Sequence, residues 1–92
     1  MRYFDGILKK VKIKEELQRI IEEVQENPYY RRIDMPKPIF IRVDSVDDET
    51  EKVSMTNQYT SFSMGILEFC DAHEHLDQDE DIEAAKDLLE GK

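Results

Sequence analysis

A helical pattern of apolar residues occupies the first third of the chain. Within residues 13–24 apolar side chains recur at intervals of three or four, at Ile13, Leu17, Ile20, Ile21 and Val24. This spacing is typical of one face of an amphipathic helix. Asn27 and Pro28 follow, and a residue before proline avoids helical backbone angles, so we expect the helix to end there.

The residues in front of this segment do not continue its apolar stripe. At about 100° per residue, Ile7, Leu8 and Val11 fall on another side of the helical wheel. Gly6 stands just before them. This break in phase predicts a separate short element, either a helical turn or an edge strand.

The middle of the chain has the alternation that is typical of β-strands. Residues 38–44 place three β-branched side chains on one face and alternate them with an aromatic and a basic side chain. Residues 45–51 are polar and predict a turn, and residues 52–56 predict a second strand that closes a hairpin. Residues 29–33 are a third candidate strand.

Helical spacing returns in the C-terminal third. Residues 61–76 and residues 81–91 each place their apolar side chains on one helical face, so each segment predicts a helix. Asp79 or Asp81 is suited to cap the start of the last helix, and Gly91 is suited to end it.

Together these elements predict a single α+β domain over residues 1–92. Its order is an N-terminal helix, a small antiparallel β-hairpin or sheet, and acidic C-terminal helices. A chain of 92 residues is long enough to bury one core and too short for a second one.

Charge is distributed unequally between the two halves of the chain. Residues 1–46 hold ten basic and eight acidic residues, a net +2, whereas residues 47–92 hold three and fourteen, a net −11. The total of −9 repels nucleic acids and anionic membranes and attracts basic proteins. We therefore expect no direct nucleic-acid binding and no membrane binding. The basic stretch at residues 9–14, with Arg31 and Arg32, is interpreted as a solvated face or as a partner for the acidic half.

The N-terminal sequence and the cysteine content indicate an intracellular protein. Asp5 and clustered lysines interrupt the apolar region that a signal peptide needs. The longest uncharged run, residues 53–67, is too polar to span a membrane. Cys70 is the lone cysteine and has no intramolecular disulfide partner. It is expected on an apolar helix face between acidic residues, which favours packing over reactivity.

The acidic run at residues 77–90 raises the question of calcium. Asp77, Asp79 and Asp81 alternate as at the start of an EF-hand loop. That loop requires glycine at its sixth position and a bidentate glutamate at its twelfth. Counted from Asp77, these positions are Ile82 and Leu88; counted from Asp79, the twelfth is Glu90 but the sixth is Ala84. The residues from Asp81 onward also have helical periodicity, which the loop cannot have. We therefore expect no metal ion and no cofactor.

The acidic residues are also poorly compensated by positive charge. Lys86 is the single basic residue between Glu68 and Glu90, against ten acidic residues. An ordinary solvated helix more often carries opposite charges one turn apart, because like charges at that spacing are mildly destabilising. On the predicted helices two acidic stripes form, Glu68–Asp71–Glu74 and Glu83–Asp87–Glu90.

Such stripes have the spacing and the sign of a DNA strand. Carboxylates one helical turn apart lie roughly 5–6 Å from one another. DNA carries a phosphate about every 3.4 Å of axis on each strand, and the winding of the strand makes the true separation larger. The acidic residues of the predicted hairpin turn would add to the array. The candidate partner-binding residues are Asp44, Asp47, Asp48, Glu49, Glu51, Glu68, Asp71, Glu74, Asp77, Asp79, Glu80, Asp81, Glu83, Asp87 and Glu90.

In length, acidity and element order the chain resembles the Arn-type anti-restriction DNA-mimic proteins of T-even bacteriophages. The resemblance covers the whole chain and is strongest in "DAHEHLDQDEDIEAAKDLLE", residues 71–90. It implies inhibition of the modification-dependent restriction endonuclease McrBC in the host cytoplasm, by competition with DNA. It also implies a homodimer. It assigns no role to any individual residue.

Other chemistry is poorly supported by the residue pattern. His73 and His75 are two positions apart, which on a helix points them about 200° away from each other, unlike paired zinc ligands. His73 is expected in the core or in an interface. No nucleophile elbow or glycine-rich phosphate loop occurs, so we expect no enzymatic activity.

Two further interpretations stay open. Surplus apolar side chains such as Met64 and Phe69 either complete the monomer core or bury themselves in a two-fold dimer interface. The alternative to DNA mimicry is a generic acidic adaptor or regulator that docks through an apolar helix face and uses its charge for solubility alone.

Overall fold

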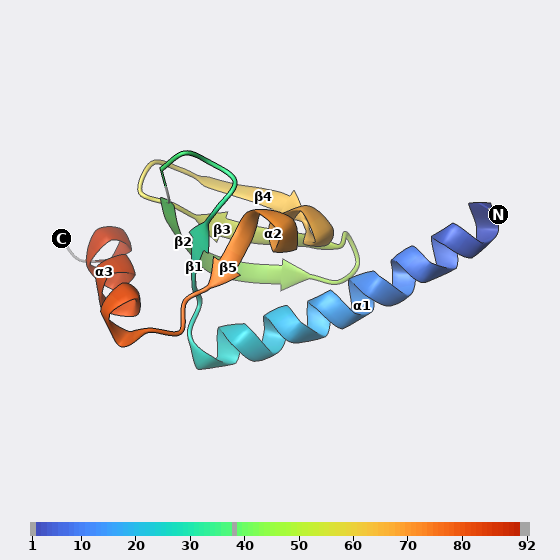
Figure 1. The fold of residues 1–92 in the computed structure, drawn as a ribbon, viewed down its shortest axis with the longest axis horizontal. Coiled ribbons are helices and arrows are strands. Elements are labelled where there is room, and N and C mark those ends of the chain that lie inside the picture. The colour runs from blue at the N-terminus through green and yellow to red at the C-terminus, as the bar shows by residue number, and fades with distance from the viewer. Residues whose placement is uncertain (1, 38, 91–92) are drawn as a thin grey trace.

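The computed structural model describes residues 2–37 and 39–90, and over these residues the chain forms three helices and a five-stranded antiparallel sheet. The sheet order is β4-β3-β2-β1-β5 (Figure 1). The predicted α+β class is confirmed. In chain order the elements are α1 (Arg2–Glu26), β1 (Tyr29–Arg32), β2 (Ile39–Asp47), β3 (Lys52–Thr56), β4 (Ser61–Gly65), α2 (Ile66–Ala72), β5 (His73–His75) and α3 (Asp79–Leu89).

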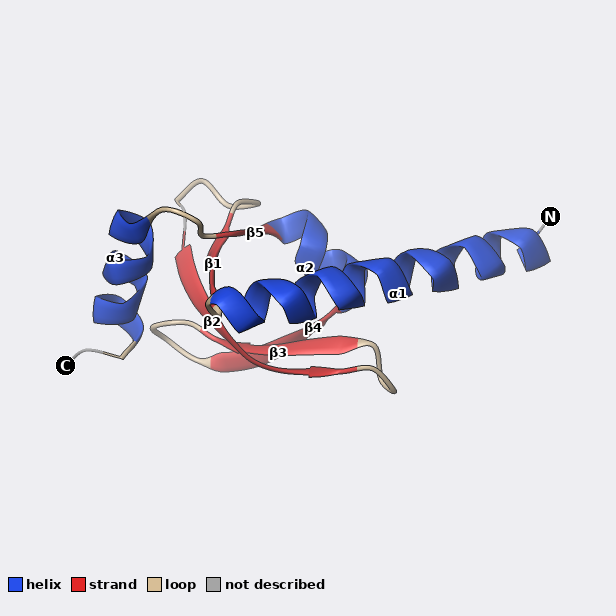
Figure 2. Ribbon diagram, turned by 90° about the horizontal axis from the view of Figure 1, so that it is seen from below, coloured by secondary structure: helices blue, strands red, loops and turns tan. Residues whose placement is uncertain are grey.

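The helices cover opposite faces of the sheet, and the two tyrosines of β1 show why. Successive side chains of a strand point to opposite faces. Tyr30 packs with α1 and α2 in the larger core, whereas Tyr29 packs with Leu76 and Ala85 beneath α3. Both tyrosines are at most 3% exposed. The sheet is therefore the middle layer between α1 with α2 on one side and α3 on the other (Figure 2).

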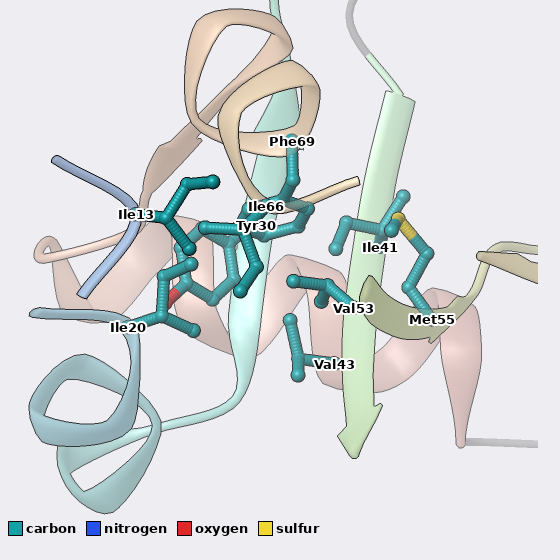
Figure 3. Close-up of a cluster of buried hydrophobic side chains, with 9 residues drawn as sticks. All are labelled: Ile13, Ile20, Tyr30, Ile41, Val43, Val53, Met55, Ile66 and Phe69. Carbon is teal, nitrogen blue, oxygen red and sulfur yellow. The ribbon is translucent and has the colours of Figure 1, made fainter. Parts of the chain in front are cut away.

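The larger core is built from the alternation that the sequence shows in the strands. Its fully buried members come from both helices of that face and from three strands (Figure 3). Tyr30 and Phe69 meet edge to face with their ring centroids 5.0 Å apart. The core residues are Ile13, Ile20, Tyr30, Ile41, Val43, Val53, Met55, Ile66 and Phe69.

The N-terminal helix is longer than its apolar stripe predicts. The prediction of a separate element around residues 6–11 is wrong, because α1 runs without interruption from Arg2 to Glu26. Its first part projects beyond the sheet (Figure 1). There Leu8 and Val11 are 58% and 49% exposed. Because they do not pack on the core, they need not lie on the same side of the helix as the apolar residues that follow.

The predicted helix over residues 61–76 is also wrong in part. Residues 61–65 form edge strand β4, in which Phe62 and Met64 pair with β3 and pack on the core. The helix covers residues 66–72 alone. At His73 the backbone becomes extended, with φ −136° and ψ 153°, and pairs with β1. There the backbone groups of β5 find partners on the edge of β1 that β2 leaves free.

The last helix begins slightly earlier than predicted. Gln78, rather than Asp79 or Asp81, is its N-cap residue, and no side chain caps the first turn by a hydrogen bond. The predicted stop at Gly91 lies outside the described residues. The hairpin prediction is confirmed, with β2 and β3 paired on either side of a turn at residues 48–51.

Candidate functional site

The acidic surface of α3 follows from how this helix packs. Ala85 is fully buried, and Ile82 and Leu89 pack beside it against the sheet. The opposite side of the helix carries Glu80, Glu83 and Asp87, all exposed. These three carboxylates are spaced i, i+3 and i+7, so neighbours lie roughly 5–6 Å apart on one face.

The first turn of α3 adds further negative charge. Asp79, Glu80 and Asp81 occupy this turn. Acidic side chains are favourable there because the helix dipole places partial positive charge at the N-terminus. Asp79 and Asp81 thus belong to a helix rather than to an ion-binding loop.

Arg31 fixes the start of α3 to the sheet. Its guanidinium donates to Glu74 of β5 at 3.1 Å and forms an ion pair with Asp81 of α3 at 2.9 Å. Its charge also lies 5.9 Å from the centre of the Phe40 ring. Arg31 thus pairs with two residues of the acidic half, which is one of the two interpretations of the basic residues, although the sequence does not identify these partners. Arg31 lies opposite Glu74 in the pairing of β1 with β5. This neighbour could be predicted only if strand β5 were predicted, and the sequence pattern did not predict it.

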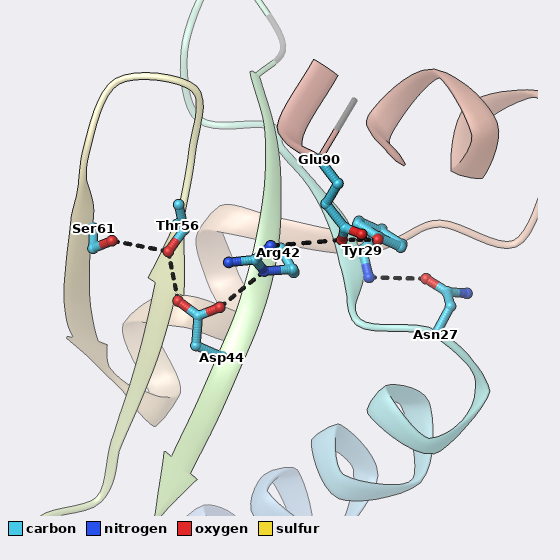
Figure 4. A network of polar contacts seen from close by, with 7 residues as sticks. All are labelled: Asn27, Tyr29, Arg42, Asp44, Thr56, Ser61 and Glu90. Carbon is cyan, nitrogen blue, oxygen red and sulfur yellow. Dashed lines mark hydrogen bonds and ion pairs between the residues drawn. The ribbon is translucent and has the colours of Figure 1, made fainter. Parts of the chain in front are cut away.

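A second polar network fixes the end of α3 (Figure 4). The Tyr29 hydroxyl donates to the carboxylate of Glu90, and Arg42 lies 3.6 Å from the same carboxylate. Burial, reinforced by the neighbouring Glu90 carboxylate, raises the pKa of Tyr29 to about 12. Arg42 also donates to Asp44 at 2.9 Å, and Asp44 accepts from the Thr56 hydroxyl at 2.5 Å. Asp44 and Glu90 therefore have internal partners.

These networks change the predicted stripes. Glu90 turns toward the sheet, so it does not extend the exposed row of Glu83 and Asp87. Glu74 lies on β5 and pairs with Arg31, so it does not continue a helical row with Glu68 and Asp71. Both predicted stripes are wrong as drawn, because each assumed a helix that ends earlier in the structure.

The β2–β3 turn is a compact acidic tip. Asp47 accepts backbone hydrogen bonds from Glu49 at 2.9 Å and from Thr50 at 3.3 Å, and these bonds lower the pKa of Asp47. Glu51 has a positive φ of 58°, in the left-handed region that closes the turn. Asp47 therefore shapes the turn, and it is exposed, as are Asp48, Glu49 and Glu51.

The lysines of α1 lie near this tip without pairing to it. Lys10 and Lys14 share a cavity of about 370 Å³ with Asp48 and Glu51. Among the residues that the structure describes, no ion pair joins these groups within 4 Å. The basic stretch is thus a solvated face that adjoins an acidic turn.

The candidate carboxylates divide into two groups. Asp44, Glu74, Asp81 and Glu90 form ion pairs with arginines of the sheet. The other group has no cationic partner within 4 Å among the described residues. This group is exposed on the β2–β3 turn, on α2 and on and before α3, and Asp47 in it also shapes its turn. Its members are Asp47, Asp48, Glu49, Glu51, Glu68, Asp71, Asp77, Asp79, Glu80, Glu83 and Asp87.

The histidines and the cysteine lie on the opposite face of the sheet from α3. His73 is 5% exposed, which confirms its predicted place in the core. His73 and His75 are on strand β5 rather than on a helix, so the two rings share one face, and the predicted divergence is wrong. Cys70 is half-buried, and burial raises its pKa to about 11. Over residues 2–37 and 39–90 no cluster of three or more metal-ligating side chains occurs.

Comparison with protein-family models, with curated proteins and with solved structures finds no match for this chain. None of the helices in the described part of the chain combines the length and the apolar character that a membrane crossing requires.

Proposed function

We propose that the protein is a non-enzymatic inhibitor that presents DNA-like negative charge to a DNA-binding protein of the host. The observation that carries this proposal is the outward row of Glu80, Glu83 and Asp87 on α3, which has no compensating cation within 4 Å in the described part of the chain. Free carboxylates at this spacing suit lysines and arginines that normally hold phosphates.

Two features support a row that is ready to bind. Arg31 and Arg42 hold α3 at its two ends, so little conformational freedom is lost when a partner docks. The acidic tip of the β2–β3 turn and the exposed acids of α2 lie away from α3 along the molecule (Figure 1). A partner with an extended basic groove would contact more than one of these groups.

The target that we propose is the modification-dependent endonuclease McrBC, in the host cytoplasm, in line with the Arn-type resemblance. In this account the protein occupies the DNA site of the enzyme and catalyses nothing itself. A homodimer would carry a charge of −18 and a longer array. The adaptor alternative needs a free apolar helix face. On α3, Ile82, Ala85 and Leu89 are occupied by its own core, whereas Leu8 and Val11 on α1 are exposed, so α1 is the helix through which an adaptor would dock.

A cleavage assay tests this proposal. Purified McrBC is incubated with methylated DNA while the protein is titrated, and an unrelated nuclease serves as the specificity control. The triple variant E80Q/E83Q/D87N should lose protection, because it removes the charges that replace phosphates. It should still fold, because these residues make no ion pair within the described part of the chain. The matched control E15Q/E22Q/E26Q removes the same charge from exposed positions of α1 and should retain protection. Equal loss in both variants would contradict a specific role for α3.

A further inference from the structure

Strand β4 forms one edge of the sheet and pairs with β3 alone. Sheet edges are commonly protected by a lysine, a proline, a bulge or a very short strand, because their backbone groups can pair with another chain. The opposite edge, β5, has three residues and carries the charged Glu74 at its centre. β4 has five residues, no charge and no proline, and it keeps one register along β3. Helix α2 runs from the end of β4 to β5 at the other edge, away from the outer side of β4 (Figure 1).

The hydrogen-bond pattern shows which backbone groups of β4 point outward. Residue pairs in an antiparallel ladder alternate between hydrogen-bonded and non-hydrogen-bonded. At one end of the β3–β4 ladder Asn57 N–H donates to the carbonyl of Thr60 at 2.9 Å, and at the other Ile66 N–H donates to the carbonyl of Glu51 at 3.0 Å. Counted between these bonds, the second and fourth residues of β4 bond to β3, and the others point their backbone groups away from it. The outward-pointing residues are Ser61, Ser63 and Gly65.

Most of these outward groups have no partner in the part of the chain that the structure describes. Neither the N–H nor the carbonyl of Ser63 has a backbone partner, and the N–H groups of Ser61 and Gly65 have none. The carbonyl of Ser61 accepts from the Thr60 hydroxyl at 3.3 Å. Gly65 is the N-cap residue of α2, so its carbonyl faces the first turn of that helix. The edge therefore offers donors and acceptors to another strand.

A second copy of β4 fits this edge because the strand is complementary to itself. When two copies run antiparallel about a two-fold axis at Ser63, this residue lies opposite its equivalent and the two exchange both hydrogen bonds. The N–H of Gly65 then faces the carbonyl of Ser61 on either side of the axis. On the core side the same register sets Phe62 against Met64. Both side chains are half-buried on their own core, so the pairing covers apolar surface that the single chain leaves exposed.

Charge also favours a second copy over a charged partner. Residues 53–67 are the longest uncharged run of a chain in which 38% of the residues are charged, and β4 lies inside this run. Two copies of net charge −9 can approach through such a strip, whereas a basic strand finds no carboxylate on β4. Glu68 lies beside Gly65, at the end of the strand. In the pair the two Gly65 residues are roughly 13 Å apart, so their neighbouring glutamates are separated by more than the screening length of about 8 Å at physiological salt.

We propose that β4 pairs antiparallel with β4 of a second copy and joins the two five-stranded sheets into one. The inference does not rest on the proposed function, because it depends on the backbone of β4 and not on the acidic surface of α3. Helix α3 packs over Tyr29 of β1 and Phe40 of β2 and takes no part in this edge. Its carboxylates therefore stay exposed in the pair.

The mass of the full chain in solution tests the pairing. Light scattering should give twice 10.9 kDa at high concentration and a lower mass on dilution. Ser63→Pro removes the outward N–H without removing a hydrogen bond to β3, and should weaken association at least about ten-fold. Ser63→Thr keeps this N–H and is the matched control. A monomer mass at all concentrations up to about 1 mM would overturn the proposal, also if that monomer binds a strand of another protein.

Charges at position 63 test the two-fold register. Ser63→Lys and Ser63→Glu each place like charges opposite one another at the axis, so each variant alone should be a monomer where the unmodified chain is a dimer. An equimolar mixture of the two should associate. The same changes at Ser45, an exposed serine of the inner strand β2, should leave the dimer unchanged. Circular dichroism confirms that each variant folds. Dimers of both Ser63 variants alone, or no association in their mixture, would refute the register.

Hydrogen exchange reports the same register residue by residue. The amides of Phe62 and Met64 should exchange slowly in monomer and dimer alike, because β3 protects them. The amides of Ser63 and Gly65 should become slow only in the dimer. Fast exchange of these two amides in a dimer would place the contact elsewhere and overturn the proposal.

This inference and the proposed function fail separately. A chain that dimerises through β4 and leaves McrBC active would contradict the DNA-mimic proposal alone. A monomeric chain that inhibits McrBC in competition with DNA would contradict the pairing of β4 alone.

Discussion

Arg31 connects α3 to the sheet, and its removal should loosen that attachment. Its guanidinium lies 3.1 Å from Glu74 of β5 and 2.9 Å from Asp81 of α3. It also lies 5.9 Å from the ring centre of Phe40. The substitution Arg31→Met keeps most of the aliphatic chain while it removes both ion pairs and the contact of the charge with the ring. The variant therefore reports the electrostatic part of the attachment.

The magnitude follows from the exposure of the groups. The side chain of Arg31 is 28% exposed, and those of Glu74 and Asp81 are 50% and 38% exposed, so water screens both pairs. Exposed ion pairs contribute about 0.2–1 kcal/mol each, and a cation over a ring about 0.5–1 kcal/mol. We expect a loss of about 1–2 kcal/mol in the free energy of unfolding. For a domain of this length the Tm should fall by roughly 4–16 °C.

Thermal unfolding followed by circular dichroism measures this loss. Lys14→Met is the matched control, since it removes one positive charge from an exposed side chain without an ion pair among the described residues, and it should change stability by less than about 0.5 kcal/mol. A double-mutant cycle of Arg31→Met with Asp81→Asn isolates the pair. The reasoning is refuted if Arg31→Met behaves like the control, or if the two substitutions show no coupling at low salt.

Three other expectations concern buried groups. The pKa of Tyr29 is raised to about 12 in the folded chain, from about 10 in the unfolded chain. Its contribution to stability is therefore complete below a pH of about 10 and is lost as the pH rises toward about 12. In an absorbance titration, the Tyr29→Phe variant should lack one tyrosine that ionises at high pH in the unmodified chain. The thiol of Cys70, with its pKa raised to about 11 by burial, should react with a disulfide reagent far more slowly in the folded than in the denatured chain. Phe69→Ala should cost about 3–5 kcal/mol in urea unfolding, and Phe69→Leu clearly less; similar costs for both would contradict the packing.

The spacing of apolar residues predicted those helices and strands that bury one face along their whole length. Residues 13–24 and 39–43 keep one period against one core, so the N-terminal helix and the first hairpin were predicted from local pattern. In residues 61–76 three elements follow one another within sixteen positions, and their apolar residues coincide with a helical face. Ser61, Phe62, Ser63 and Met64 do alternate, which is the local signal for β4.

The tethers of α3 depend on contacts between residues far apart in the sequence. Tyr29 and Glu90 are 61 positions apart, and Arg31 and Glu74 are 43 apart. No local pattern reveals such pairs, because they arise from the order of strands in the sheet. The sequence therefore predicted a carboxylate surface from composition, but not which carboxylates are held by arginines and which are free.

The most direct test of the DNA-mimic account is competition for McrBC at equilibrium. The concentration of this protein that halves binding of labelled methylated DNA is measured at increasing concentrations of unlabelled DNA and at increasing salt. The account predicts that the halving concentration rises in proportion to added DNA, and that affinity falls steeply with salt because carboxylates replace phosphates. Absence of displacement at stoichiometric excess, or displacement independent of added DNA, would contradict it.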